Sequence, residues 1–379
     1  MSTEYDKIRP FYDHEVNDAI KRILKEQKFQ LFLSKYLLGK ENIESEIEQF
    51  SKINSVDEFQ VGISAGFFKK VISTTITELK LEGFENIQKD KSYLFISNHR
   101  DIVLDSAMLQ VALFDKGHKT TRTAIGNNLV FNDILMDISK LNKMFLVLRD
   151  GSVRELVKNS AILSSYIQHS IGEGESVWIA QRNGRTKDGN DATQQGLLKM
   201  LSMSGKESIS EKMYNLNIVP VSVSYEYESC DILKTKELSS LKINGKYEKE
   251  SGEDFMSIKT GVFQNKGNVK LHIGKPINSL SEQWQNFEGN ENEFLQNLAS
   301  VIDKQILSNY HLFANNYIAA DMLHNSSKYA KNYSQEEKDK FIQYFEENLS
   351  EIKENREISK EIFLSIYANP VFNKENISI

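Results

Sequence analysis

Short runs of apolar, β-branched and aromatic residues alternate with helical stretches between about residues 81 and 280, and this alternation constrains the fold most strongly. The runs predicted as buried strands are Tyr93–Ser97, Met144–Leu148, Ser176–Ala180, Ile218–Tyr225 and Val269–Ile273. Helical stretches, notably Val153–Ile171, separate the first three. Strands and helices that alternate in this way favour a mostly parallel sheet flanked by helices. The sequence therefore predicts an α/β fold.

The segments on both sides of this region are predicted to be helical. Apolar residues recur at mostly helical spacing over Val16–Leu38, and Gly39 stands where a C-cap glycine is expected. A second helix is predicted from Phe67 to about Leu79, and helical patterns such as Gln335–Glu347 return near the C-terminus. We predict three parts: a helical region over 1–80, an α/β domain over 81–289 and a helical region over 290–379.

Composition and charge exclude several classes of protein. Of the 379 residues 40% are hydrophobic, which is enough for a sizeable core. The net charge of -6 lacks the basic excess of a typical nucleic-acid binder. The single cysteine, Cys230, excludes an internal disulfide and a multi-cysteine zinc site. The first residues do not resemble a signal peptide, and no apolar run approaches the roughly 18 residues of a spanning helix. We expect an intracellular, cytoplasmic protein, soluble or peripheral.

One histidine stands apart because of its surroundings. The apolar run Tyr93–Ser97 ends at Asn98-His99-Arg100, and the next helix begins with Asp101 and Asp105 nearby. A histidine at the end of a strand with a carboxylate within reach suits general-base catalysis, since the carboxylate fixes the imidazole tautomer and stabilises the imidazolium. No serine or cysteine nucleophile accompanies this histidine in a recognisable motif. This favours direct attack by a hydroxyl of the substrate.

A second motif points to a hydrolase. Gly62-Ile63-Ser64-Ala65-Gly66 matches the GxSxG nucleophile elbow, in which Ser64 would be the nucleophile. The elbow requires a strand before it, whereas the preceding sixty or so residues are predicted to be helical. The small residues are better explained by close helix packing or by a helix break, and the Ser64 hydrolase remains the weaker alternative.

A series of blocks resembles the glycerolipid acyltransferase family of the glycerol-3-phosphate and 1-acylglycerol-3-phosphate acyltransferase type. Asn98-His99-Arg100 with a downstream aspartate is similar to the family's NHxxxxD block. The further similar segments, in chain order, are Leu81–Ile87, Phe145–Arg149, Ile179–Thr186 (FPEGTRS type), Val219–Tyr225 and Ile273–Ile277. Together they extend over about residues 81–280, and their order and spacing carry the resemblance.

The resemblance implies transfer of a fatty acyl group from acyl-CoA or acyl-carrier-protein to the hydroxyl of glycerol-3-phosphate or of a lysophospholipid such as 1-acylglycerol-3-phosphate, in phospholipid synthesis. His99 would be the general base and Asp105 its orienting carboxylate. Arg100, Arg149 and Arg185 would bind substrate, because guanidinium groups match phosphate oxygens in bidentate fashion. Gly184 would let the backbone approach the substrate closely. No metal or cofactor is implied, and no nucleic-acid partner.

Two departures from the family pattern affect these assignments. Five residues separate His99 from Asp105 where the family has four, so the loop must absorb the extra residue or Asp101 takes the role. We favour Asp105, because Asp101 falls near the helix start, where a carboxylate is stabilising without catalysis. In the third block Asn183 replaces the family's glutamate, and Arg185-Thr186 reverses its Thr-Arg order. These changes bear on acceptor recognition.

The alternatives to this function are an O-acyltransferase for a lyso-aminolipid and a catalytically silent lipid-binding relative. Acceptors of this kind reside in membranes, which implies docking at a membrane surface. An interfacial helix is one candidate for that contact, and the residues that would form it are Phe29, Leu31, Phe32, Leu33, Tyr36, Leu37 and Leu38 with Lys25, Lys28 and Lys35. Packing of the same residues onto the rest of the protein explains them slightly better.

Overall fold

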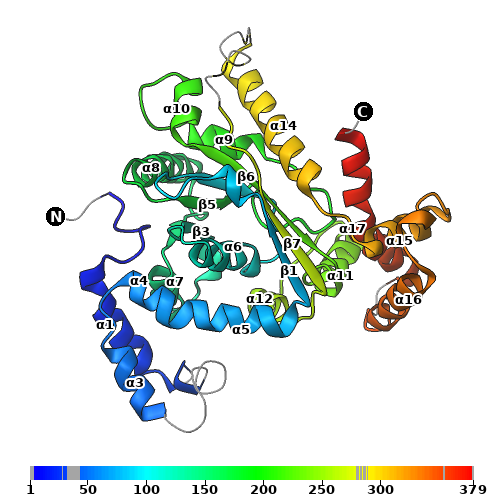
Figure 1. The fold of residues 1–379 in the computed structure, drawn as a ribbon, viewed down its shortest axis with the longest axis horizontal. Coiled ribbons are helices and arrows are strands. Elements are labelled where there is room, and N and C mark those ends of the chain that lie inside the picture. The colour runs from blue at the N-terminus through cyan, green and yellow to red at the C-terminus, as the bar shows by residue number, and fades with distance from the viewer. Residues whose placement is uncertain are drawn as a thin grey trace.

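The computed structural model has a seven-stranded sheet at its centre (Figure 1). It describes residues 4–27, 29–31, 43–278, 281, 284, 287, 289–352 and 355–377. The strands are β1 (Glu78–Glu82), β2 (Leu94–Ser97), β3 (Arg122–Gly126), β4 (Met144–Val147), β5 (Val177–Ala180), β6 (Ile218–Tyr225) and β7 (Asn268–Ile273). Their order across the sheet is β1-β7-β6-β2-β5-β3-β4. The five predicted strands are all present.

Five neighbouring strands run in one direction, and the two at one edge run in the other. Strands β6, β2, β5, β3 and β4 are mutually parallel. Strand β7 is antiparallel to β6, and β1 is parallel to β7. The predicted α/β fold with a mostly parallel sheet is therefore confirmed. Because β2, β4 and β5 are parallel, the loops that follow them emerge at the same edge of the sheet.

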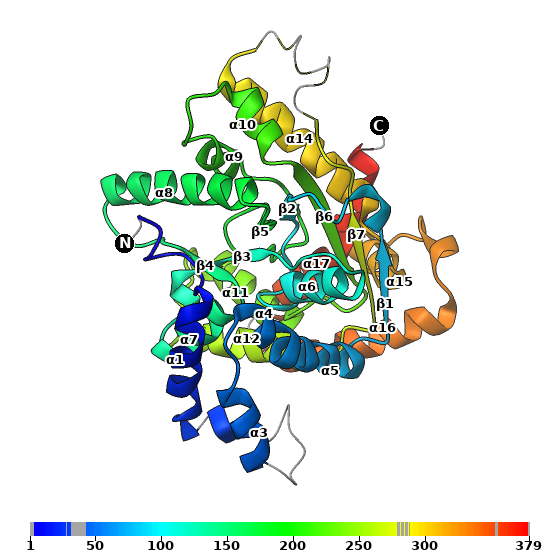
Figure 2. The same ribbon diagram turned by 60° about the vertical axis from the view of Figure 1, so that its left-hand side comes forward.

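Helices cover both faces of the sheet (Figure 2). One face packs on α8 (Val153–Gly172), α9 (Gln195–Leu201), α10 (Ile209–Asn215) and α14 (Glu291–Asn309), and it buries Ile96 and Ile179. The other packs on α5 (Ala65–Thr75), α6 (Leu104–Asp115) and α12 (Glu253–Phe263), and it buries Phe95 and Trp178. Successive residues of a strand point to opposite faces, so each buried strand serves both layers.

Two helical groups lie on opposite sides of this core (Figure 1). The N-terminal group is α1 (Asp13–Leu24), α3 (Ile43–Ser51), α4 (Val56–Phe59) and the π-helix η1 (Gln60–Ser64), packed with α7 (Asp133–Leu141). The C-terminal group is α15 (Ala314–His324), α16 (Gln335–Leu349) and α17 (Arg356–Ile377), packed with α11 (Asp231–Asn244). Single 3-10 turns are η2 (Phe84–Asn86), η3 (Asn127–Leu129) and η4 (Ala330–Asn332). The division of the chain at residues 80 and 289 stays a prediction.

Several predicted boundaries are wrong. Helix α1 ends at Leu24, but residues 27 and 29–31 are helical again, and residues 28 and 32–39 of the predicted segment lie outside the described residues. Helix α5 ends at Thr75, so Leu79 belongs to strand β1. The extended backbone of Ile76 ends that helix. Strand β3 was not predicted, because its short sequence carries only one large apolar residue.

The proposed interfacial helix falls mostly outside the described residues, since residues 28 and 32–42 are not described. Of its apolar residues Phe29 is buried in the N-terminal cluster with Val16 and Phe50, while Leu31 is exposed. Burial of Phe29 agrees with the packing interpretation for that residue. Among the described residues no helix is both long enough and apolar enough to span a membrane.

Candidate active site

His99 and Asp105 meet at the end of β2. The strand ends at Ser97, and α6 begins at Leu104 with Asp105 in its first turn. Nδ1 of His99 lies 2.9 Å from Oδ2 of Asp105. The loop between them absorbs the extra residue of the spacing, because Asp101 accepts hydrogen bonds from the backbone N–H groups of Val103 (2.8 Å) and Leu104 (2.7 Å). Asp101 thus caps the helix, and Asp105 is the partner of His99.

The Asp105 carboxylate is buried and held from several sides. Besides His99, its Oδ2 accepts hydrogen bonds from the backbone N–H groups of Arg100 (2.6 Å) and Asp101 (2.9 Å). Its Oδ1 accepts a hydrogen bond from the Tyr225 hydroxyl at 2.6 Å. Burial and the neighbouring Asp105 charge raise the pKa of Tyr225 well above its ordinary value, so this hydroxyl stays protonated and donates. The orientation of the carboxylate is therefore fixed.

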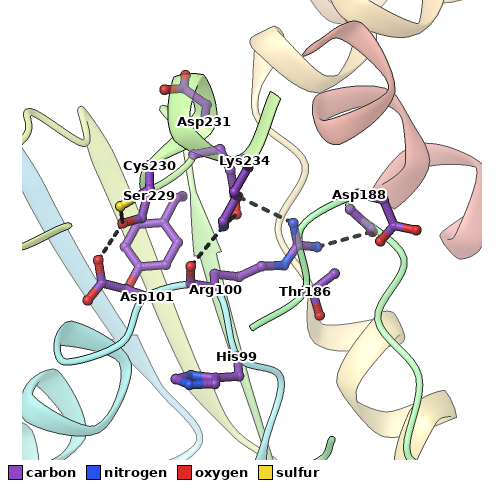
Figure 3. Close-up of polar contacts among 12 residues, drawn as sticks. His99, Arg100, Asp101, Thr186, Asp188, Ser229, Cys230, Asp231 and Lys234 are labelled. Carbon is purple, nitrogen blue, oxygen red and sulfur yellow. Dashed lines mark hydrogen bonds and ion pairs between the residues drawn. The ribbon is translucent and has the colours of Figure 1, made fainter. Parts of the chain in front are cut away.

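Asp101 occupies a different environment on the far side of the loop. Its Oδ2 accepts a hydrogen bond from the Ser229 hydroxyl (Figure 3). Burial acts to raise the pKa of Asp101, but the Lys266 charge and the hydrogen bonds from Leu104 and Ser229 outweigh it and hold the pKa below its usual value. Asp101 is consequently an ionised structural carboxylate.

Arg100, predicted to bind substrate, is instead fully buried and does not line the cavity beside His99. Its fully buried guanidinium donates to Asp191 Oδ2 (2.6 Å from Nη2) and to Glu228 Oε2 (3.3 Å). Lys234 joins this group by donating to Glu228 Oε1 at 2.6 Å and to the Arg100 carbonyl at 2.8 Å. Figure 3 shows the Arg100 side chain extending towards Thr186 and Asp188, while His99 points away from them. Arg100 is thus a buried structural cation.

The loop after β5 lies directly against the His99 loop. The backbone N–H of Thr186 donates to the His99 carbonyl at 2.7 Å, and the Thr186 hydroxyl donates to Asp191 Oδ1 at 2.7 Å. Gly184 has a φ of +72°, a left-handed conformation in which other residues are strained. Nothing lies within 4 Å of a Cβ built on Gly184, so its backbone conformation is what requires glycine there.

A cavity of about 610 Å³ opens beside His99. One part of its wall is apolar and includes Ile125, Leu135, Met144, Leu163 and Trp178. The Trp178 ring meets the imidazole of His99 edge to face, with 5.6 Å between ring centroids. The rest of the wall is polar and cationic, with Arg149, Arg182, Asn183, Gly184, Arg185 and Lys187. The cavity thus combines a base, an apolar wall and a concentration of positive charge.

The arginines of this wall lack carboxylate partners within the described part of the chain. Burial lowers the pKa of Arg149, and no carboxylate offsets it. Its guanidinium covers Gly126, where a Cβ would lie 3.0 Å from Cζ. Nη1 of Arg185 and Nε of Arg182 are buried without a hydrogen-bond partner there. The fold thus brings Arg149 and Arg185, two of the predicted site residues, to the same cavity as His99.

Two neighbours of the site were not singled out from the sequence. Arg182 lies within the third block and lines the cavity. Because arginines bind anions well, every arginine of that block could have been predicted as a binding residue from the sequence. Tyr225 ends the fourth block, but nothing in a run of strand residues indicates that its hydroxyl reaches Asp105.

Ser64 is not placed as a nucleophile elbow requires. It ends the π-helix η1, which continues directly into α5, and the first strand of the sheet comes only afterwards. Its hydroxyl donates to Oδ1 of Asn142 at 2.5 Å. Within the described residues no cluster of three or more His, Cys, Asp or Glu side chains could hold a metal ion.

A His–Asp pair at the end of a parallel strand thus faces a cavity that is partly apolar and partly cationic. Residues 78–224 match the family model described as Acyltransferase. This match confirms the resemblance, and this part of the chain is an acyltransferase-family domain. A crystal structure of PlsC, the 1-acyl-sn-glycerophosphate (LPA) acyltransferase from Thermotoga maritima, is similar at 14% identity and a TM-score of 0.36, over 76% of this chain and 94% of that one. No curated protein matches the sequence significantly.

Proposed function

We propose that this acyltransferase moves a fatty acyl group from a thioester donor, acyl-CoA or acyl-carrier-protein, to the hydroxyl of glycerol-3-phosphate or of a lysophospholipid such as 1-acylglycerol-3-phosphate. The observation that carries the proposal is the position of the His99–Asp105 pair at a cavity with an apolar wall and several arginines that have no described carboxylate partner. An acyl chain suits the apolar wall, and an acceptor phosphate suits the arginines.

The proposed chemistry follows from the hydrogen bond between the pair. Because Asp105 accepts a hydrogen bond from Nδ1 of His99, the neutral imidazole carries its proton on Nδ1. Nε2 is then free to take the proton of the acceptor hydroxyl. The acceptor oxygen forms a C–O bond to the thioester carbonyl, and the tetrahedral intermediate collapses with cleavage of the C–S bond. The departing thiolate takes the proton back from the imidazolium. Asp105 stabilises the imidazolium while it exists.

The acceptor phosphate is assigned to Arg149 and Arg185, with Arg182 as a third arginine of the same wall. None of the three is neutralised by a described carboxylate, so an incoming phosphate faces no internal competitor. Gly184 supports this loop by adopting a left-handed turn. Asn183 also lines the cavity in place of the family's glutamate, so a carboxylate that would repel an anionic acceptor is missing at this position.

We propose that the protein works in the cytoplasm and docks peripherally on the inner face of the membrane, as part of phospholipid synthesis. What supports this is the chemistry of the substrates, because a lysolipid acceptor is held in a bilayer while thioester donors are water-soluble. Cosedimentation with vesicles that contain 1-acylglycerol-3-phosphate tests the docking, and absence of the protein from the pelleted vesicles would contradict it.

A substrate panel tests the proposed function. The purified enzyme is given acyl-CoA or acyl-carrier-protein with glycerol-3-phosphate, 1-acylglycerol-3-phosphate or a lyso-aminolipid, and products are identified by mass spectrometry. We expect an ester with a phosphate-bearing acceptor, and no ester with the His99→Ala variant. Preference for the lyso-aminolipid would overturn the assigned acceptor. Thioester or acceptor binding without any product would instead identify a silent lipid-binding relative.

A further inference from the structure

Tyr225 lies in the part of strand β6 that extends beyond the end of the neighbouring strand β2. Ser97, the last residue of β2, pairs with Val221 of β6, and β6 continues to Tyr225 beside the loop that carries His99. The Asn98 side chain fixes this overlap, since it accepts from the Val223 N–H at 2.8 Å and donates to the Val223 carbonyl at 2.9 Å. On its other side Tyr225 pairs with Val269 of β7. The Tyr225 backbone is therefore held by β7 on one side, and Asn98 holds Val223, two residues earlier, on the other.

The Tyr225 side chain uses this position to reach Asp105. Its hydroxyl donates to Oδ1 at 2.6 Å, whereas His99 and two backbone N–H groups donate to Oδ2. Within the described part of the chain, Tyr225 is the one donor to Oδ1. The side chain is 1% exposed and is not part of the cavity wall, so it has no contact with a substrate there.

We propose that Tyr225 is a positioning residue for the general base, acting through Asp105. Its hydroxyl keeps Oδ2 aimed at Nδ1 of His99, and it draws negative charge towards Oδ1. A carboxylate whose negative charge is drawn towards Oδ1 holds the imidazolium less tightly through Oδ2, so the base is regenerated more readily. This inference rests on the proposed function for its kinetic consequence, but the hydrogen-bonded geometry is independent of the acceptor.

Other titratable groups surround the same carboxylate and must stay constant in a test. Those within electrostatic reach of Asp105 or Tyr225 are Asp101, Glu228, Lys266 and Tyr310. A Tyr225→Phe substitution removes one hydroxyl and leaves all four in place. The matched control is Tyr93→Phe, because Tyr93 is also buried and its hydroxyl accepts a hydrogen bond from the Gln88 N–H at 2.9 Å. Tyr93 precedes the opposite end of β2 and does not contact Asp105.

The experiment measures kcat, both KM values and the pH dependence of kcat/KM for wild type and both variants. For Tyr225→Phe we expect kcat to fall roughly tenfold, the low end for a hydrogen bond to a charged group, with both KM values unchanged. The acid limb of kcat/KM should move to higher pH, because without the Tyr225 hydroxyl the Asp105 charge acts more fully on the imidazolium through Oδ2. Tyr93→Phe should keep the wild-type limb and most of the wild-type kcat.

A second readout does not depend on turnover. Carbon-13 labelling of the histidine rings allows the titration of the His99 imidazole to be followed by NMR, with the signal assigned by its loss in His99→Gln. Tyr225→Phe should raise the pH at which this signal titrates, and Tyr93→Phe should leave it unchanged. An unchanged titration and acid limb in Tyr225→Phe would overturn the inference. Wild-type protein that transfers no acyl group, while the NMR shift is present, would overturn the proposed function and leave the positioning contact intact.

Discussion

Two groups of arginines lie near His99, and the protein holds them in opposite ways. Arg100 is fully buried, and its charge is matched by Asp191 and Glu228. Arg149, Arg182 and Arg185 line the cavity without a carboxylate partner among the described residues. Burial of Arg100 acts to lower its pKa, but the charge of Asp191 and its other neighbours raise it well above the ordinary value, whereas burial lowers the pKa of Arg149 unopposed.

The difference separates a structural charge from a binding charge. A buried ion pair is complete within the fold, so losing one partner leaves an uncompensated charge and costs stability. A cavity arginine without a partner is completed only by a ligand, so losing it costs binding. His99 lies at the boundary between the two groups, which makes it the first place to test the comparison.

The largest effect is expected for His99→Ala. The imidazole is 13% exposed at the cavity, and its one side-chain hydrogen bond to a described residue joins Nδ1 to Asp105, so its removal takes away the base with little loss of packing. Loss of a general base costs ~10²–10⁴ in rate. Turnover under saturating substrates and the urea unfolding midpoint are measured together. A variant that keeps more than about half of the wild-type rate would end the assignment of His99 as the base.

Arg100→Met tests the structural side of the comparison. Removing the guanidinium leaves Asp191 and Glu228 buried with one cation fewer, at a cost of about 3–5 kcal/mol in the free energy of unfolding. Urea denaturation followed by circular dichroism measures this loss. Arg185→Met is the matched control and should change the free energy of unfolding by less than about 1 kcal/mol. Equal losses of unfolding free energy in both variants would contradict the difference between Arg100 and the cavity arginines.

Substitutions of the two aspartates should also have different effects: one should lower the rate, and the other should lower the stability. Asp105→Asn places an amide donor against Nδ1 of His99 and should lower the single-turnover rate roughly 10²-fold. Asp101→Asn should leave that rate within a few-fold and cost on the order of 1 kcal/mol of stability through the helix cap. The reverse ranking would assign the catalytic carboxylate to Asp101.

The loss of unfolding free energy caused by Asp101→Asn should depend on pH. The pKa of Asp101 in the folded protein lies below its usual value, so ionisation stabilises the fold above the ordinary aspartate range. That contribution is lost as the pH falls through the range between the two pKa values. The difference in unfolding free energy between wild type and variant should therefore shrink between pH 7 and acidic pH.

Arg185→Ala tests the binding side. Losing a charge-assisted pair with a phosphate removes roughly 1.5–3 kcal/mol, so the KM for the acceptor should rise about 10- to 100-fold while that for the thioester changes little. Lysine at this position should rescue only in part, because a point charge does not reproduce the guanidinium fork. Saturation curves for donor and acceptor measure both constants. If the KM values for the donor and the acceptor rise equally, the assignment of Arg185 to the acceptor fails.

The smallest effect is expected for Ser64→Ala. This hydroxyl bonds to Asn142 in a helical segment away from the His99–Asp105 pair, so turnover should equal that of wild type. A progress curve at saturating substrate is sufficient. Complete loss of activity in this variant alone would revive the hydrolase alternative.

The core strands were predictable because their sequences are dense in apolar residues. Leu94–Ser97 and Ile218–Tyr225 are buried on both faces, and such strands have continuous apolar sequences. Strand β1 was missed although its charged and apolar residues alternate as in a half-buried strand, because it follows helix α5 after only two residues and was included in the end of that helix. The end of the first helix at Leu24 was missed because apolar periodicity continues beyond it.

The base and its partner were predictable from local sequence, but their supports were not. His99 and Asp105 are six positions apart and joined by one loop, so spacing and helix geometry connect them. Tyr225 and Asp191 come from segments about a hundred residues away, and only the sheet order brings them to this loop. Arg100 was assigned to substrate because its neighbour is catalytic, whereas successive residues leaving a strand point in different directions.

The origin of each group in the sheet has a consequence for how such an enzyme diversifies. The base is supported by β2, α6 and β6, while the arginines of the cavity come from the loops after β4 and β5. Under the proposed function, chemistry and acceptor choice therefore depend on different segments of the chain. On the same proposal, a substitution such as asparagine for glutamate at 183 changes the cavity wall, while Thr186 of the same loop keeps its hydrogen bond to the His99 carbonyl. Related enzymes that keep one reaction can in this way acquire new acceptors through sequence changes in this loop alone. Exchange of the loop after β5 offers the same route in the laboratory.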